Sequence, residues 1–191
     1  QMLVNSATLA LAYLALGRTQ DARAAVGKAV EAGPANVNAR VAEARVTAFD
    51  GDVTRALAQI EAVVAANPGN TDALLLKADL ESARGDGSSA AKTLERVIEI
   101  NPSGTAARFS LIANLVQRGS IDEAATQLEA VRKLAPGNVR TLYSEALVAY
   151  ARGDYAAARP YFEQALGIRR EVLGEKQTDT ATSLNKVGGR L

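Results

Sequence analysis

Apolar side chains recur along this chain in short segments with the spacing of an α-helix. In one such segment Ala158, Phe162 and Ala165 stand at i, i+4 and i+7, and therefore share one helix face. Gly153 and Asp154 precede it, and these residue types commonly end one helix and cap the next. The pattern predicts two helices joined by a short glycine turn.

The same pattern occurs five times at a fixed interval. Three residue types keep a 34-residue spacing over most of the chain: the glycines Gly17, Gly51, Gly85, Gly119 and Gly153, the alanines Ala22, Ala56, Ala90, Ala124 and Ala158, and the prolines Pro34, Pro68, Pro102 and Pro136. Self-similarity at such a period indicates a repeat protein. We expect five tandem units, at residues 3–36, 37–70, 71–104, 105–138 and 139–172, each containing two helices of about 14 residues.

A helix–turn–helix unit of this length and phasing resembles the tetratricopeptide repeat (TPR) family over residues 3–172. The large aromatic residue often found early in the first helix of such repeats is replaced here by Ser6, Arg40, Leu74, Arg108 and Leu142. The resemblance implies an all-α fold, a right-handed superhelical solenoid of antiparallel helix pairs. Each second helix carries an apolar stripe that one hairpin cannot bury, so neighbouring units must stack.

Residues 173–191 leave the 34-residue register. A segment that matches a first helix begins at Ala181, later than that register allows, and its distance from Val139 resembles the 42-residue repeats of kinesin light chains. We interpret residues 173–191 as a linker plus the terminal helix of a partial sixth repeat, with a terminal cap as the alternative. Leu184, Val187 and Leu191 are apolar where a cap would be polar, which favours the partial repeat.

Composition narrows the function classes. The 191 residues are 48% hydrophobic and carry a net charge of +1, with neither cysteine nor histidine. Disulfides and thiolate metal sites are therefore excluded, although the compartment stays undecided between cytoplasm and periplasm for a soluble protein. No apolar run reaches the roughly 18 residues of a membrane span, so direct membrane insertion is not expected. The chain opens inside a helical pattern at Met2, and we expect it to be a fragment of a longer protein.

The sequence offers little for catalysis, and we predict a protein that is not an enzyme and needs no cofactor or metal. Acid–base and nucleophilic catalysis often use histidine or cysteine, and both are missing. The residues from Gly85 to Ala90 match the Gly-x-Gly-x-x-Ala sequence of dinucleotide-binding proteins. That motif requires a preceding strand, whereas a predicted helix precedes it here. A near-neutral chain without a basic stripe also has little attraction for nucleic acid.

The TPR resemblance implies that the first helix of each unit lines a concave groove. Its lining is mostly apolar, with isolated charges at Arg45, Asp72, Asp79 and Arg140. Repeats one to five lack the Lys and Asn of carboxylate-clamping co-chaperones, which disfavours that ligand class. Several apolar positions are equally compatible with inter-repeat core. The candidate groove residues are Val41, Arg45, Phe49, Leu75, Asp79, Phe109, Val116, Tyr143, Leu147, Tyr150 and Asn185.

We therefore predict a non-catalytic scaffold that binds a partner peptide or helix, with an amphipathic helix as the best fit to an apolar groove. One alternative is a structural segment of a longer solenoid that self-associates through its terminal helix into a homo-oligomer. Another is the helper segment of a larger chain with a separate catalytic domain. The alanine-rich composition of the repeats also resembles that of bacterial TPR proteins of the cell envelope, including accessory proteins of exopolysaccharide export.

Overall fold

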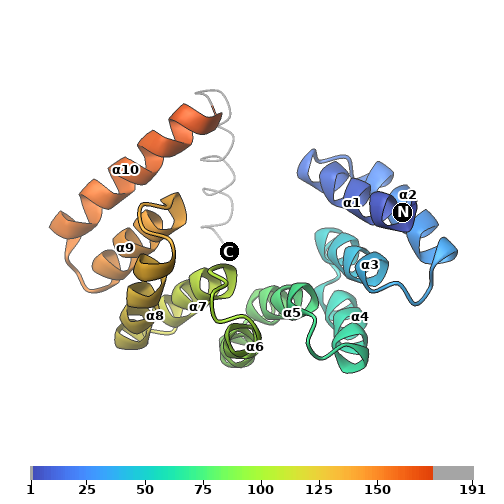
Figure 1. Ribbon diagram of the computed structural model, residues 1–191, viewed down its shortest axis with the longest axis horizontal. Coiled ribbons are helices and arrows are strands. Elements are labelled where there is room, and N and C mark those ends of the chain that lie inside the picture. The colour runs from blue at the N-terminus through green and yellow to red at the C-terminus, as the bar shows by residue number, and fades with distance from the viewer. Residues whose placement is uncertain (1, 174–191) are drawn as a thin grey trace. The chain divides into compact units, whose positions relative to one another are not determined.

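The structure is a computed structural model that describes the backbone of residues 2–173 and the side chains of residues 7–168 and 170. Within that range every regular element is an α-helix, and ten helices follow one another along the chain (Figure 1). The predicted all-α helical repeat fold is confirmed. The helices are α1 (Met2–Ala15), α2 (Thr19–Ala32), α3 (Val37–Phe49), α4 (Val53–Ala66), α5 (Thr71–Ala83), α6 (Gly87–Ile100), α7 (Ala106–Gln117), α8 (Ile121–Leu134), α9 (Val139–Ala151) and α10 (Tyr155–Leu173).

The five regularly spaced glycines end the first helix of each hairpin. All five have a positive φ, between 70° and 91°, in the left-handed region that favours glycine. At the first turn the N–H of Gly17 donates to the carbonyl of Leu14, and the N–H of Arg18 donates to that of Tyr13. This pair of bonds is a Schellman motif, which satisfies the last carbonyls of the helix. The other four turns repeat it.

Polar side chains cap the following helices. The carboxylates of Asp52, Asp86 and Asp154 accept hydrogen bonds from backbone N–H groups of α4, α6 and α10 at 2.9–3.0 Å. The pKa of Asp86 lies below its ordinary value, first because of its bond from the Ser89 N–H. Asn36 and Asn70 cap α3 and α5 in the same way. Each cap satisfies a donor that the first turn of a helix leaves unpaired.

The contacts group the protein into two compact units, Gln1–Ala107 (unit 1) and Arg108–Leu191 (unit 2). In unit 1, α3 packs against α1, α2, α4 and α5, so it is buried between its neighbours. Its Ala42 and Val46 join a core cluster with α1 and α2, and its Val41 and Ala44 join another with α4 and α5. Stacking therefore buries the apolar stripes of these second helices, as the repeat pattern requires.

Two polar contacts in unit 1 join neighbouring helices, and a lysine of the same helix supports the second. Arg23 of α2 donates two hydrogen bonds, of 2.9 and 2.6 Å, to the carboxylate of Asp50 at the end of α3. Inside the third hairpin, Glu81 of α5 is buried and accepts a hydrogen bond of 2.8 Å from the Thr93 hydroxyl of α6. Lys77 lies one helical turn before Glu81, with its Nζ 3.5 Å from the other carboxylate oxygen.

In unit 2, α9 packs against α8 and α10. The side chain of Asn114, on α7, is buried, and its Oδ1 has no hydrogen-bond partner in the described part of the protein. The equivalent positions in the repeats before and after it carry the buried apolar residues Leu80 and Val148. Asn114 is thus a polar interruption in an otherwise apolar row.

Helix α10 runs to Leu173 without stopping at Pro160, which lies in its sixth position. A proline there has no N–H for the bond to the carbonyl four residues earlier. The predicted terminal helix of a partial sixth repeat, with Ala181 at its start, lies outside the described residues, and the proposed boundaries of the five units stay a prediction.

Candidate interaction site

The candidate groove residues of unit 1 lie on two first helices, α3 and α5. Val41 is buried in the core, whereas Arg45 and Leu75 are half-buried. Phe49, the last residue of α3, is exposed, and so is Asp79. The structure therefore divides these residues between core and surface.

A cavity of about 340 Å³ lies on the first-helix face of unit 1. It joins α1, α3 and the start of α5, and two candidate residues, Val41 and Arg45, contribute to it. Asp72 of α5 faces the same cavity, so one cation and one anion lie within a partly apolar wall. Its lining residues are Ala7, Thr8, Leu11, Asn38, Val41, Ala42, Arg45 and Asp72.

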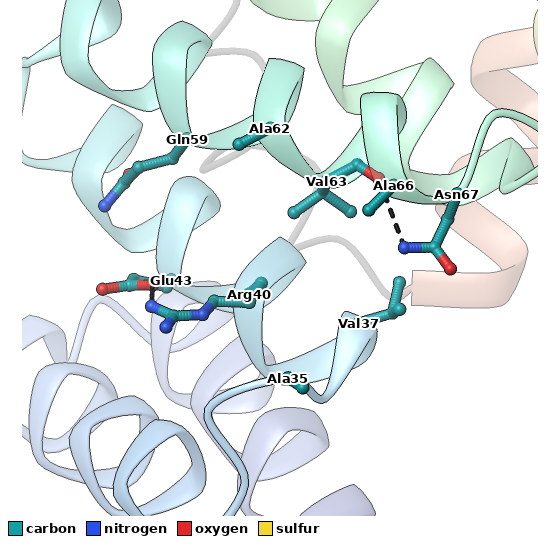
Figure 2. Close-up of a pocket in the computed structure, with 9 residues that line it drawn as sticks. All are labelled: Ala35, Val37, Arg40, Glu43, Gln59, Ala62, Val63, Ala66 and Asn67. Carbon is teal, nitrogen blue, oxygen red and sulfur yellow. Dashed lines mark hydrogen bonds and ion pairs between the residues drawn. The ribbon is translucent and has the colours of Figure 1, made fainter.

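A second cavity, of about 420 Å³, lies between α3 and α4 (Figure 2). Val37 and Val63 supply apolar wall, and Arg40 is held to one side because it donates hydrogen bonds to the Pro34 carbonyl and the Glu43 carboxylate, at 2.7 and 2.8 Å. The sequence prediction missed this cavity. Small residues open it: Ala62 and Ala66 stand where the next repeat has Arg96 and Ile100.

The candidate groove residues of unit 2 also separate into core and surface. Phe109 is only 6% exposed, and the guanidinium of Arg140 lies 4.6 Å from the centre of its ring. Val116 and Leu147 are half-buried. Tyr143 and Tyr150 of α9 are exposed, by 43% and 57%. Asn185 lies outside the described residues.

Each exposed tyrosine of α9 pairs with an aromatic ring of α10. Tyr143 meets Phe162 edge-to-face, with ring centres 5.8 Å apart, and Tyr150 meets Tyr155 in the same way at 5.1 Å. All four rings are exposed. We call this set, Tyr143, Phe162, Tyr150 and Tyr155, the aromatic array. The exposure of Phe162 is unexpected, because the equivalent residue one repeat earlier, Leu128, is buried.

Among the described residues there is no group of three or more acidic side chains arranged to hold a metal ion. None of the described helices is long and apolar enough to cross a membrane. Several exposed charged groups serve as helix caps or form ion pairs, as where hydrogen bonds from Arg23 hold the pKa of Asp50 below its ordinary value.

Comparison with protein families settles what the repeats are. One tetratricopeptide repeat model matches residues 8–70 and 109–171, and a second matches residues 50–115. The chain belongs to the tetratricopeptide repeat family. The resemblance predicted from the phasing of glycine, alanine and proline is confirmed, and TPR units typically serve as non-catalytic interaction scaffolds.

Solved TPR structures share the fold at low sequence identity. MamA is 20% identical with a TM-score of 0.64, and the match covers 90% of this chain and 95% of MamA. A TPR protein from Parabacteroides merdae is 16% identical with a TM-score of 0.68, and the match covers 87% of this chain and 66% of that protein. YrrB, described as a TPR protein with an unusual peptide-binding site, is 20% identical with a TM-score of 0.61, and the match covers 92% of this chain and 90% of YrrB. No curated protein matches the sequence.

Proposed function

We propose that this TPR protein is a non-catalytic scaffold that binds a segment of a partner protein on the exposed faces of its first helices. The observation that carries the proposal is the exposure of Tyr143 and Tyr150 on α9. Large aromatic side chains gain about 25 cal/mol for each Å² of apolar surface that leaves water, so an exposed pair offers free energy to a partner. Exposed apolar patches commonly mark interaction sites.

The cavity on the first-helix face of unit 1 supports the same function. Arg45 and Asp72 enter no hydrogen bond or ion pair within the described part of the chain, and both line this cavity. A peptide backbone presents carbonyl acceptors and N–H donors, which suit a neighbouring cation and anion. The likeness to YrrB, described as a TPR protein with an unusual peptide-binding site, agrees with a peptide as the class of ligand.

A peptide-display selection tests the proposal. Random peptides would be selected on the wild-type protein and then titrated against the double variant Tyr143→Ala/Tyr150→Ala. We expect the dissociation constants of most selected peptides to rise roughly tenfold or more, as is typical when central aromatic anchors are removed. Far-ultraviolet circular dichroism should be unchanged, because both rings are exposed.

Leu134→Ala is the matched control. Leu134 ends α8 in the same unit and is 43% exposed, the same fraction as Tyr143, but it belongs to a second helix. Peptide affinity should be unchanged in this variant. Selected peptides that bind the tyrosine double variant as tightly as wild type, or that lose affinity only with Leu134→Ala, would refute binding on the first helices.

A further inference from the structure

The aromatic array has a regular geometry that restricts what it can bind. Tyr143 and Tyr150 are seven residues apart on α9, and Tyr155 and Phe162 are seven residues apart on α10. Seven residues are close to two helical turns, so each helix carries both of its aromatic residues on one face, at backbone positions about 10.5 Å apart along its axis. The two edge-to-face pairs thus form two parallel ridges across the α9–α10 hairpin.

We propose that the array is a docking surface for a proline-rich segment in the polyproline II conformation. This inference rests on the proposed scaffold function and specifies the ligand at the same site. A polyproline II helix rises about 3.1 Å per residue with three residues per turn, so prolines at i and i+3 lie about 9.3 Å apart on one side. That repeat nearly matches the distance between the two ridges. Leu147, half-buried between Tyr143 and Tyr150 on α9, gives the intervening surface an apolar floor.

Aromatic ridges suit proline chemically. Proline-rich segments bind in aromatic-lined grooves in several unrelated domains, because their conformation is preformed and costs little entropy to order. The negative face of an aromatic ring attracts the positively polarised C–H groups of the pyrrolidine ring. A polyproline II backbone has no internal hydrogen bonds, so its carbonyls remain free to accept bonds from the hydroxyls of Tyr143, Tyr150 and Tyr155.

The charges beside the array favour a neutral ligand. Both charged side chains of α9 already have partners inside unit 2: Arg140 lies over the ring of Phe109, and Glu145 accepts a hydrogen bond of 2.6 Å from Arg132. On α10, Arg159 donates to Glu163 at 2.7 Å. Glu145 and Glu163 are thus each neutralised by an arginine beside the ridges, whereas the cation of Arg140 lies against a neutral ring. An amphipathic helix, whose flanking residues are usually charged, would find no unpaired carboxylate on α9.

The experiment uses the complete 191-residue chain and fluorescein-labelled decaproline, with fluorescence anisotropy as the readout. We expect saturable binding whose dissociation constant rises about tenfold or more in Tyr143→Ala and in Tyr150→Ala. Tyr143→Phe/Tyr150→Phe retains the rings and removes two donors, so it should weaken binding roughly two- to tenfold. The Leu134→Ala control should bind as wild type does. Because the proposed contacts between proline and the aromatic rings involve no charged group, affinity should change little between about 0.05 and 0.5 M salt.

Other occupants give different results, and each would overturn the proposal. If an alanine-rich amphipathic helical peptide binds and decaproline does not, the array is a helix-binding surface. If sedimentation shows a dimer that Tyr143→Ala abolishes, a second copy of this chain is the occupant. If decaproline fails while library-selected peptides still depend on Tyr143 and Tyr150, the scaffold function stands and the polyproline assignment alone is wrong. If neither decaproline binding nor the binding of library-selected peptides depends on Tyr143 and Tyr150, the proposed scaffold function is refuted as well.

Discussion

Replacing Thr93 by valine should destabilise the protein far more than the loss of one hydroxyl on a surface would. Valine has nearly the same shape as threonine, so packing is retained, but the hydrogen bond of 2.8 Å to Glu81 is lost. Both partners are almost fully buried, with 4% of Glu81 and 8% of Thr93 exposed. In the variant, the Glu81 carboxylate would retain its ion pair with Lys77, whose Nζ lies 3.5 Å away.

The expected cost follows from the charge on the acceptor. Hydrogen bonds to charged groups contribute about 1.5–3 kcal/mol, and a buried acceptor that loses its donor also retains its desolvation cost. We therefore expect Thr93→Val to lower the free energy of unfolding by about 2 kcal/mol. For a chain of this length that corresponds to a fall in Tm of about 4–8 °C. Urea denaturation followed by circular dichroism would measure it.

Two further variants make the argument refutable. Thr126→Val is the matched control, since Thr126 also lies in a second helix but is exposed and donates to a backbone carbonyl, that of Asp122. Its effect should stay within about 0.5 kcal/mol. Glu81→Leu/Thr93→Val removes both polar groups and should recover most of the loss, because paired polar groups can be replaced by apolar ones at little cost. One repeat later, the position equivalent to Glu81 is occupied by Leu115, which is buried, so the fold accommodates a leucine there. A Thr93→Val effect as small as the control, or a double variant whose loss is additive, would refute this account.

Three other predictions concern stability. Asn114→Leu should raise the free energy of unfolding by about 1–2 kcal/mol in urea titrations, because it removes an unpaired buried carbonyl. Ala124→Leu should lower it by about 1–3 kcal/mol in the same assay, because this alanine is completely buried where two helices meet. Asp50 has a lowered pKa because of hydrogen bonds from Arg23, so its stabilisation is complete above the ordinary value of about 3.9 and is lost as the pH falls through the lowered folded value. Thermal scans from about pH 5 to pH 2 should therefore show a smaller fall in Tm for Asp50→Asn than for wild type.

The turns and caps of this protein could be predicted from sequence because their causes are local. A glycine such as Gly51 ends a helix through its own backbone conformation, and the side chain of Asp52 caps the helix that follows. Neither feature depends on a distant part of the chain. Repetition at one fixed interval then strengthens each local signal, which is why the fold class and the family could both be predicted.

The division of the candidate groove residues into core and surface could not be predicted in the same way. Phe109 and Tyr143 occupy equivalent positions in successive repeats, yet the first is buried and the second is exposed. The difference arises from neighbours, since Arg140 lies over the ring of Phe109. The partner of each tyrosine in the aromatic array likewise depends on how α9 and α10 align, which residue spacing alone does not specify.

The repeat also separates stability from binding in a way that single-domain proteins rarely allow. The alanines that recur at one position of the repeat, such as Ala56 and Ala124, are buried and are constrained by packing. One distinctive surface arises where the fifth repeat departs from the others, with the exposed Phe162 in place of a buried aliphatic residue. Because each unit is stabilised mainly by its nearest neighbours, a departure at one position alters one surface and leaves the remaining interfaces intact. Substitutions at the invariant positions should therefore change stability first, and substitutions at the departures should change binding first.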